Sequence, residues 1–412
     1  TTFIQIVHPV CCGVDVHKKK ISACLITVDK NGKEHHEIKE FRTFTDDLVK
    51  MKNWLLDNEC PVLAMESTSV YWRPVHNILE GFMEVILVNA RHIKNVPGRK
   101  TDISDSKWLA GLLRHGLLKG SFIPPKEIRQ WRDLTRLRRT YTESLADFKR
   151  RVHKLFETAN IKIDSVVSDL FGVTGLNLIA LLCDGSELDL ATIEQNTKPG
   201  LKKKVVELHR SIQGFFEDHH RFQLIGMMDV MTSLEKQIDD ITQRLDALTV
   251  GHQDILDRLD EVPGIDKKSA QSILSEIGVT LDEFICTAAL ASWAGLCPGN
   301  NESAGKRKSG RASVRSHPFK TILIEVAWAA VRKKGSYYRA KYFKLKSRRG
   351  AKKAIVAIAH RISKAIYNII KNGDHFMDLG EDYLTAQTKE RTINNIKKRA
   401  NQLGYELVPC EN

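Results

Sequence analysis

The first ninety or so residues alternate apolar and polar positions in the way that β-strands require. The segments CCGVDVHK (11–18), ISACLITVD (21–29) and HEIKEFRTF (36–44) predict three strands. Asn31-Gly32 predicts a tight turn between the second strand and the third. We therefore expect the chain to begin with an antiparallel meander.

Helical and strand patterns alternate after the meander. They predict a helix over 46–58, a strand over 61–67, a helix over 69–80, a strand over 83–89, and a helix from about 103 to 117 with Thr101 or Asp102 as its cap. A three-stranded meander followed by alternating helix and strand is the order of an RNase H-like α/β fold. The length fits such a domain over residues 1–125.

Residues 126–258 are predicted to form a helical, coiled-coil region. A charged helical pattern covers about 127–159, and a later apolar seam alternates spacings of three and four. The seam consists of Leu224, Met227, Met231, Leu234, Ile238, Ile241, Leu245, Leu248, His252, Ile255 and Leu259. It fits either an intramolecular helix packed against 127–159 or a dimer contact. An antiparallel hairpin that also mediates oligomerisation would satisfy both.

The segment LDEVPGIDKKSAQSILSEIG (259–278) resembles a helix-hairpin-helix. In such a motif, turn amides at a helix N-terminus hold a DNA phosphate without reading the base sequence. The residues that we expect to contact DNA are Pro263, Gly264, Ile265, Lys267 and Lys268. The alternative is a turn that merely joins two helices.

Helical patterns return beyond residue 303. Apolar stripes over 322–330 and 354–370 predict two packed helices, with basic residues on their outer faces and in the connection over 332–353. We expect residues 259–412 to form a mainly α-helical C-terminal domain.

Positive charge is concentrated in the same region. The formal net charge is +14, and residues 303–373 contain twenty lysines and arginines against one acid, Glu325. Interleaved with them are the aromatic residues Tyr337, Tyr338, Tyr342 and Phe343. Lysine and arginine neutralise phosphates and aromatic rings stack on bases, so the pattern indicates a nucleic-acid partner rather than only a solvated surface.

The eight cysteines show no C-x-x-C spacing and no nearby set of histidines, which argues against a zinc site or a redox pair. We interpret them as buried free thiols in a reducing cytosol. The chain starts without the pattern of a signal peptide, and no apolar run approaches the length of a bilayer span. The expected location is cytoplasmic, with no membrane partner.

Four carboxylates are candidates for a metal site. Asp15 lies between two valines in a strand, where burial of a charge is costly, and Glu66 ends a second apolar strand. These strands are neighbours in an RNase H-like sheet, and Asp102 and Asp105 are three residues apart at the start of a helix. Converging carboxylates need cations and suit Mg²⁺ or Mn²⁺, and two such ions about 4 Å apart can clamp a phosphodiester. Taken singly, Asp102 fits an N-cap, Asp105 a first-turn acid and Glu66 a loop acid.

An actin-like ATPase also begins with a strand that carries an aspartate and a hairpin. That group requires glycine with serine or threonine just after the aspartate, so that the backbone can approach phosphates. Val16, His17 and Lys18 occupy these places, and no second glycine-rich loop follows. The sequence therefore argues against an ATPase.

Five segments in order resemble the DEDD transposases of the insertion sequence one-ten family, which are related to Piv-type DNA invertases. They are GVDVHKKKISACLI, AMESTSVYW, GRKTDISDSKWLAGLLRHG, LDEVPGI and LASWAGLCPGNNESAGKRKSGRA. The resemblance covers nearly the whole chain, and the ordered set is specific although no single segment is.

The resemblance implies a RuvC-like domain, a coiled-coil insertion and a C-terminal transposase domain that supplies a nucleophilic serine. The family's carboxylate tetrad matches Asp15, Glu66, Asp102 and Asp105, and its serine matches Ser303. The resemblance also implies a structured bridge RNA whose loops pair with target and donor DNA. It further implies a tetramer, arranged as a dimer of dimers, that acts at the nucleoid of a bacterial or archaeal cell.

The sequence departs from the family after the serine. Family members often have a glycine-rich stretch and a Leu-Arg pair there, whereas this chain has VRSHPFKTIL, with Ser316-His317-Pro318. The departure concerns the path of that loop and does not argue against Ser303.

The mechanism that the resemblance implies is an attack of Ser303 on a scissile phosphate, which gives a phosphoserine link to one DNA end. The basic residues expected to hold the DNA there are Lys306, Arg307, Lys308, Arg311 and Arg315. Two hypotheses compete with it. One is a RuvC-like metal-dependent junction endonuclease that uses water as nucleophile, and the other is an architectural DNA-binding protein without catalysis.

Overall fold

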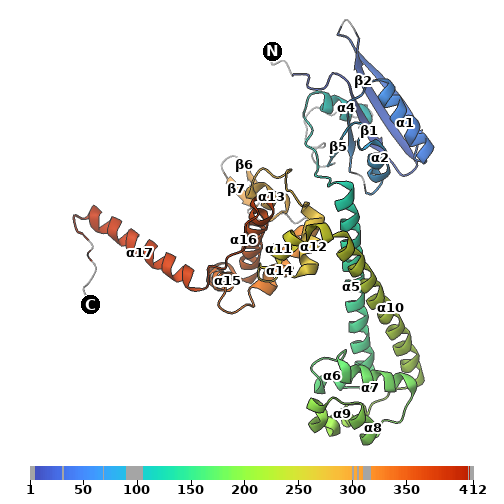
Figure 1. Cartoon of the computed structure of the whole chain (residues 1–412), viewed down its shortest axis with the longest axis vertical. Coiled ribbons are helices and arrows are strands. Elements are labelled where there is room, and N and C mark those ends of the chain that lie inside the picture. The colour runs from blue at the N-terminus through green and yellow to red at the C-terminus, as the bar shows by residue number, and fades with distance from the viewer. Residues whose placement is uncertain are drawn as a thin grey trace. The chain divides into compact units, whose positions relative to one another are not determined.

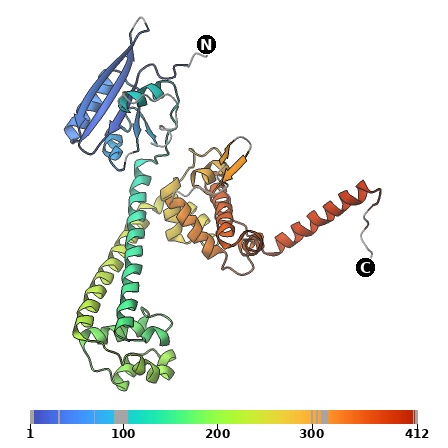
Figure 2. The ribbon, with the colours of Figure 1, turned by 180° about the vertical axis from the view of Figure 1, so that it is seen from behind.

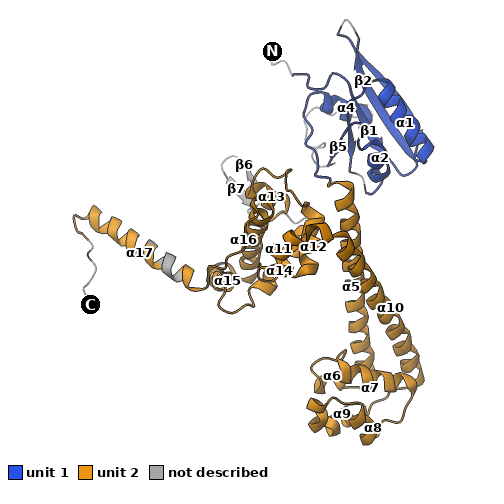
Figure 3. Ribbon diagram, viewed as in Figure 1, with its two compact units in different colours: residues 1–123 blue, residues 124–412 orange. Residues whose placement is uncertain are grey.

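The computed structural model (Figures 1 and 2) describes residues 5–29, 32–67, 69–89, 105–298, 301–303, 306–309, 317–406 and 408. The chain divides into two compact units, residues 1–123 and residues 124–412 (Figure 3). Each unit has its own core and is described separately below.

Unit 1 contains a mixed five-stranded sheet. The strands are β1 (Cys11–Val16), β2 (Lys20–Val28), β3 (Glu34–Arg42), β4 (Val62–Glu66) and β5 (Glu84–Val88). Their order is β3-β2-β1-β4-β5, with antiparallel pairing among β1, β2 and β3 and parallel pairing of β4 with β1 and β5. The predicted meander and the alternation after it are confirmed, and the sheet is compatible with an RNase H-like domain.

Helices cover both faces of this sheet (Figure 1). Helices α1 (Thr45–Asp57) and α2 (Trp72–Leu79) pack on one face, where Cys12, Val14 and Val16 point from β1. Helix α4 (Asp105–Arg114) packs on the opposite face with Cys11. Because side chains alternate along β1, this strand contributes residues to the hydrophobic core on each face of the sheet. The predicted caps Thr101 and Asp102 lie outside the described residues.

Gly13 permits the close approach of α4 to β1. A Cβ atom at this position would lie 2.2 Å from both the Ala110 nitrogen and the Ser106 carbonyl oxygen. These are backbone atoms of α4, so they cannot move aside without shifting the helix. Glycine is therefore required here by packing rather than by backbone conformation.

We expect Gly13→Ala to lower the free energy of unfolding of unit 1 by roughly 3 kcal/mol, because the added methyl group displaces α4. Gly111→Ala is the matched control on the same helix, since a Cβ there meets nothing within 4 Å. It should be neutral or stabilise by about 0.5–1 kcal/mol. Urea unfolding together with hydrogen exchange at the β1 and α4 amides measures both. Equal stability of the two variants would contradict the packing argument.

Unit 2 begins with a helical hairpin. Helix α5 (Lys126–Thr158) and helix α10 (Asp218–Leu248) lie side by side in both views (Figures 1 and 2). Between them in sequence is a small bundle of α6 (Ile163–Val166), α7 (Val173–Asp184), α8 (Leu190–Gln195), η1 (Pro199–Lys204) and α9 (Val205–Ser211).

The apolar seam packs within the chain. Leu224 and Met231 share a core with Val152 and other residues of α5, and Ile241 and Leu245 share another with Ile128 and Trp131. These contacts match the intramolecular interpretation of the seam. A dimer contact through the same helices stays a prediction.

The seam does not form one helix as far as residue 259. Helix α10 ends at Leu248, and η2 (Val250–His252) and α11 (Gln253–Asp260) follow. The break contains Gly251, which has low helix propensity, and Thr249, whose hydroxyl donates back to the Leu245 carbonyl. The apolar residues keep the same spacing on both sides of this break, so the spacing alone could not predict where the helix ends.

The C-terminal part of unit 2 is mainly helical, as predicted. It contains α12 (Lys267–Ile277), α13 (Thr287–Trp293), the short antiparallel pair β6 (Asn301–Ser303) and β7 (Lys306–Ser309), α14 (Pro318–Ala330), α15 (Tyr337–Arg349), α16 (Ala351–Asn372) and α17 (Asp382–Gln402). Helices α14 and α16 are the two predicted apolar helices and pack together. The segment over 332–353, expected to be a connection, instead contains the helix α15.

Arginines of α5 attach the hairpin to α12. Arg136 donates through Nε and a terminal nitrogen to both oxygens of the buried Glu276, at 2.8 and 2.9 Å. Arg132 donates to the Ser275 and Glu276 carbonyls at the C-terminus of α12, and the buried Arg138 donates to Gln271. Burial lowers the pKa of the Arg138 guanidinium from its ordinary value. These charge-assisted bonds join α5 and α12 directly.

Four of the seven described cysteines are buried, as predicted: Cys11, Cys12, Cys24 and Cys60. Burial raises the pKa of the Cys11 thiol to about 12, so this thiol stays protonated and unreactive at neutral pH. Cys183 and Cys297 are half-buried and Cys286 is exposed, which corrects the expectation that all are buried. Among the described helices, none is both long and apolar enough to span a membrane.

Candidate active site

Asp15 and Glu66 lie on neighbouring parallel strands. The register of β1 and β4 pairs Val14 with Met65, and Asp15 and Glu66 are the next residue on each strand. Val14 and Met65 both point into the core beneath α1 and α2. Since side chains alternate along a strand, Asp15 and Glu66 both point to the opposite face, at the edge where the two strands end.

The N-terminus of α4 lies beside Asp15 on that face. Asp15 pairs with Ser22 across β1 and β2, and the Ser22 hydroxyl oxygen lies 3.1 Å from that of Ser106. Asp105, the first residue of α4, precedes Ser106. The fold thus places Asp15, Glu66 and the start of α4, at Asp105, on one face of the sheet. That these carboxylates form a metal site stays a prediction. Asp102 lies outside the described residues.

His17 contacts Asp15, and the sequence reasoning did not predict this contact. Its Nε2 lies 3.0 Å from an Asp15 carboxylate oxygen, and the His17 ring is exposed whereas Asp15 is partly buried. The sequence contained a signal for this contact, because residues two apart in an extended segment share a face. The imidazole can therefore orient the Asp15 carboxylate.

The ligand atoms of this site fit a hard divalent cation. Asp15, Glu66 and Asp105 offer carboxylate oxygens, and none of the three is fully buried. Oxygen-rich sites of this kind are typical of Mg²⁺ and Mn²⁺. The carboxylates come from two strands and a helix. Among the described residues, ligand atoms of three such side chains gather within 4.8 Å of one another only at the N-terminus of α10, so Asp15, Glu66 and Asp105 do not form a preassembled cation site by themselves.

A second group of ligand types occurs at the N-terminus of α10. Ligand atoms of Glu217, His219 and His220 lie within 4.8 Å of one another. Helix capping accounts for this geometry, because Glu217 accepts from the His220 backbone and His220 Nδ1 accepts from the Glu217 backbone at 3.2 Å. We assign these residues to the helix cap.

Ser303 is the last residue of β6. Its backbone pairs with Lys306 on β7, so the serine stands at the tip of a two-stranded hairpin. Lys306, Arg307 and Lys308 form most of β7, whereas Arg311 and Arg315 lie outside the described residues. The sequence reasoning did not predict this hairpin. The sequence signal for it is weak, namely the glycine of the Ala304-Gly305 pair between two short segments. Ser303 belongs to unit 2 and the carboxylates belong to unit 1.

The turn between α11 and α12 packs on one side against α14, while Gly264 stays exposed. Pro263 and Ile265 are buried, and a Cβ at Gly264 would lie 2.5 Å from the Val326 carbonyl oxygen of α14. The Ile265 amide donates to the Val262 carbonyl, and Asp266 caps α12. Of the predicted DNA contacts in this segment, Gly264, Lys267 and Lys268 are exposed, and the Lys267 ammonium lies 2.9 Å from an Asp246 carboxylate oxygen. The geometry favours a turn that joins two helices.

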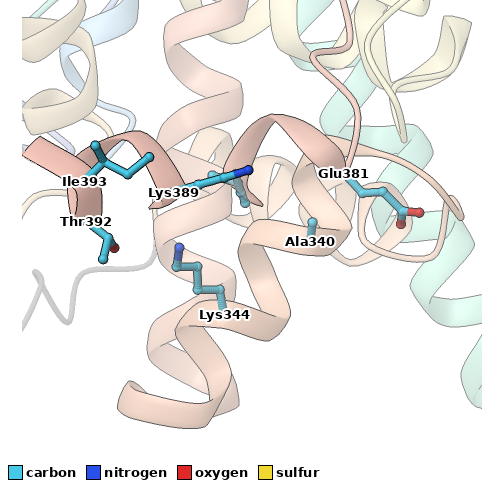
Figure 4. A pocket seen from close by; sticks show the side chains of 7 residues that line it. Ala340, Lys344, Glu381, Lys389, Thr392 and Ile393 are labelled. Carbon is cyan, nitrogen blue, oxygen red and sulfur yellow. The ribbon is translucent and has the colours of Figure 1, made fainter. Parts of the chain in front are cut away.

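A basic surface extends over α15, α16 and the turn before α15. Its exposed cations include Arg332, Lys333, Lys334, Lys346, Arg348, Arg349, Lys352 and Lys353. Helices α15 and α17 also enclose a groove of about 600 Å³ lined by Ala340, Lys344, Glu381, Leu384, Lys389, Thr392 and Ile393. Lys344 extends from α15 toward α17, which carries Lys389 (Figure 4). This part of the protein suits a polyanion.

Two family models match the chain. Residues 12–161 match a model of DEDD transposases of the IS110 type, described as a transposase, and this match includes Asp15, Glu66 and Asp105. Residues 256–343 match a model described as Transposase IS116/IS110/IS902 family, and this match includes Ser303. No individual curated protein matches the chain.

The two matches are in the order that the motifs predict and together cover more than half of the chain. A transposase binds and cuts DNA, so these matches identify the protein as an enzyme that acts in the transposition of an insertion element. The chain belongs to the IS110 family of transposases.

Proposed function

We propose that the protein cuts and rejoins DNA with a metal-assisted serine nucleophile. The observation that carries the proposal is that Asp15, Glu66 and the start of α4, at Asp105, lie on one face of the sheet. Together with Asp102 they would hold Mg²⁺ or Mn²⁺, as two ions. When bound, the ions would stabilise negative charge on the phosphoryl and leaving oxygens.

Ser303 supplies the nucleophile in this proposal. Its hydroxyl oxygen forms a bond to the scissile phosphorus, its proton passes to a carboxylate of the tetrad, and the bond from phosphorus to a deoxyribose oxygen breaks. That oxygen takes up a proton and becomes a free hydroxyl. When a hydroxyl of a new strand attacks the phosphoserine ester, the strands are rejoined and Ser303 is released. The ester conserves the bond energy, so no nucleotide cofactor is consumed.

The partners belong to the same proposal. A bridge RNA would pair with target and donor DNA, and a tetramer would bring serines and carboxylates of different protomers to two DNA duplexes. The basic residues after Ser303 would hold the phosphates that flank the cut. What supports this is the family membership, the position of Ser303 beside Lys306 on the hairpin, and the excess of cations in unit 2.

Hydrolysis by water is the second candidate function. The candidate metal ligands Asp15, Glu66 and Asp105 all belong to unit 1, so hydrolysis by a metal-activated water would need no residue of unit 2, which contains Ser303. In that case the protein is a junction endonuclease and Ser303 has a structural role in the hairpin.

Product analysis distinguishes the two functions. The full-length protein, purified with its RNA, is incubated with DNA that carries the element ends and target, in Mg²⁺. We expect rejoined strands and a protein-linked DNA intermediate, and we expect both to disappear after ribonuclease treatment. The RNA that copurifies should contain segments that match the flanking DNA. Hydrolysed ends without linked protein would instead establish the endonuclease. Activity that survives ribonuclease would show that the protein itself, and not an RNA, recognises the target DNA.

A further inference from the structure

The structure separates the aromatic residues of the basic region into two groups. Tyr338 and Tyr342 are buried, with 4% and 5% of their surface exposed, and they attach α15 to its neighbours. Phe343 is 49% exposed. Trp328 on α14, which the charge pattern did not single out, is 40% exposed. On α14 and α15, Trp328 and Phe343 are thus the exposed rings, and Tyr337 is half-buried.

These two rings flank a buried one. The Trp328 and Tyr342 ring centroids are 5.8 Å apart, and those of Tyr342 and Phe343 are 5.4 Å apart, both in edge-to-face geometry. The cluster therefore fixes two partly exposed rings on adjoining helices. Because both contact the same buried tyrosine, they are held in place before any ligand arrives.

Two cations lie near the exposed Phe343 ring. The Arg339 guanidinium lies 5.2 Å from the Phe343 ring centroid and the Lys346 ammonium lies 5.8 Å from it. Across residues 317–373, the described acids amount to Glu325 alone, and Glu325 pairs with Arg139. A surface of this charge repels cationic partners and attracts polyanions.

The combination of cations with exposed rings points to unpaired nucleic acid. A duplex offers phosphates to lysine and arginine but keeps its bases stacked inside, so exposed rings add little to duplex binding. An unpaired strand offers bases as well, and stacking of a base on an aromatic side chain contributes about 1–3 kcal/mol. The exposed rings are thus explained by a single strand and not by a duplex.

We propose that Trp328 and Phe343 form a stacking platform for an unpaired nucleic-acid strand, whose phosphates lie on the surrounding lysines and arginines. The proposal rests on the proposed function only in taking nucleic acid as the partner. RNA and DNA strands share the recognised chemistry, and the experiment separates them.

Binding is measured with the full-length protein in EDTA, so that no DNA is cut. Labelled single-stranded DNA, single-stranded RNA and duplex DNA of equal length are titrated at several salt concentrations. Phe343→Ala and Trp328→Ala are each expected to weaken single-strand binding by about 10-fold and duplex binding by less than about 2-fold. Binding should also quench the tryptophan fluorescence of the wild type, and Trp328→Phe should remove most of that quenching while keeping the affinity.

Phe222→Ala is the matched control, since Phe222 is an 80% exposed ring on α10 outside the basic surface. It should leave all three affinities unchanged. Circular dichroism checks that the helical content of each variant equals that of the wild type, and Phe343→Tyr should keep the binding that Phe343→Ala loses.

A loss confined to RNA identifies a guide strand, and a loss confined to DNA identifies a separated substrate strand. Equal losses for single strand and duplex, or none for either, would overturn the platform. An intact protein that binds no nucleic acid at all would instead reject the proposed function.

Discussion

Replacing Asp15 with asparagine is expected to abolish DNA cleavage and strand transfer while unit 1 stays folded. The amide has nearly the same shape as the carboxylate but carries no charge, so cation binding weakens and the stabilisation of phosphoryl charge is lost. A loss of about 4 kcal/mol of transition-state stabilisation corresponds to roughly a 1,000-fold decrease in rate. The rate of appearance of cut strands, measured on a gel at saturating DNA, tests this.

Cation binding gives a second readout that does not depend on activity. The affinity for Mn²⁺, measured by calorimetry or electron paramagnetic resonance, should fall in Asp15→Asn and also in Glu66→Gln and Asp105→Asn. Glu40→Gln is the control, because Glu40 is an exposed strand carboxylate that lies on β3 and pairs with Lys20. Full activity of all three site variants would support an architectural DNA-binding role instead.

The sheet and its carboxylates were accessible from the sequence because local patterns determine them. Alternation along β1 places Asp15 on the face opposite Val14, and the meander-then-alternation order makes β1 and β4 neighbours. The parallel register then puts Glu66 beside Asp15. The close contact of α4 with Gly13 was not accessible, because it depends on a tertiary contact between distant segments.

Helix α15 shows why the basic surface was only partly predictable. Its buried face consists of Tyr338 and Tyr342, four residues apart, in a segment otherwise rich in cations. Two apolar positions are too few to reveal a helical period. The sequence therefore could not show which of the four aromatic residues in this segment are buried and which are exposed. Once the helix is known, the same spacing separates the buried tyrosines from the exposed Phe343.

The turn at Gly264 shows a limit of the motif, and DNA binding by this turn stays a prediction. Its sequence resembles a phosphate-binding hairpin, but the features that define the motif also permit a close helix contact. Gly264 has a φ of +88° and abuts the backbone of α14, so packing alone accounts for the glycine. The sequence motif predicts the backbone conformation of the turn, but it does not predict whether the turn contacts DNA or another helix.

Replacing Ser303 with alanine is expected to eliminate the covalent protein–DNA intermediate and the rejoined product. Alanine removes the only atom that the proposed mechanism requires of this side chain, and the hairpin backbone that pairs Ser303 with Lys306 can accept it. The yield of protein-linked DNA, measured after denaturation by the slow migration of labelled DNA, should fall at least about 1,000-fold. Mn²⁺ affinity should not change, which separates this variant from Asp15→Asn.

The control for Ser303 lies in the same hairpin. Ser309 also carries a hydroxyl and pairs with Asn301, so Ser309→Ala removes a hydroxyl from the other strand of the hairpin. It should keep the covalent intermediate and the rejoined product. If Ser303→Ala still became linked to DNA, another residue would be the nucleophile. If it released hydrolysed ends at the wild-type rate, water would be the nucleophile and the carboxylates of unit 1 would suffice for cutting.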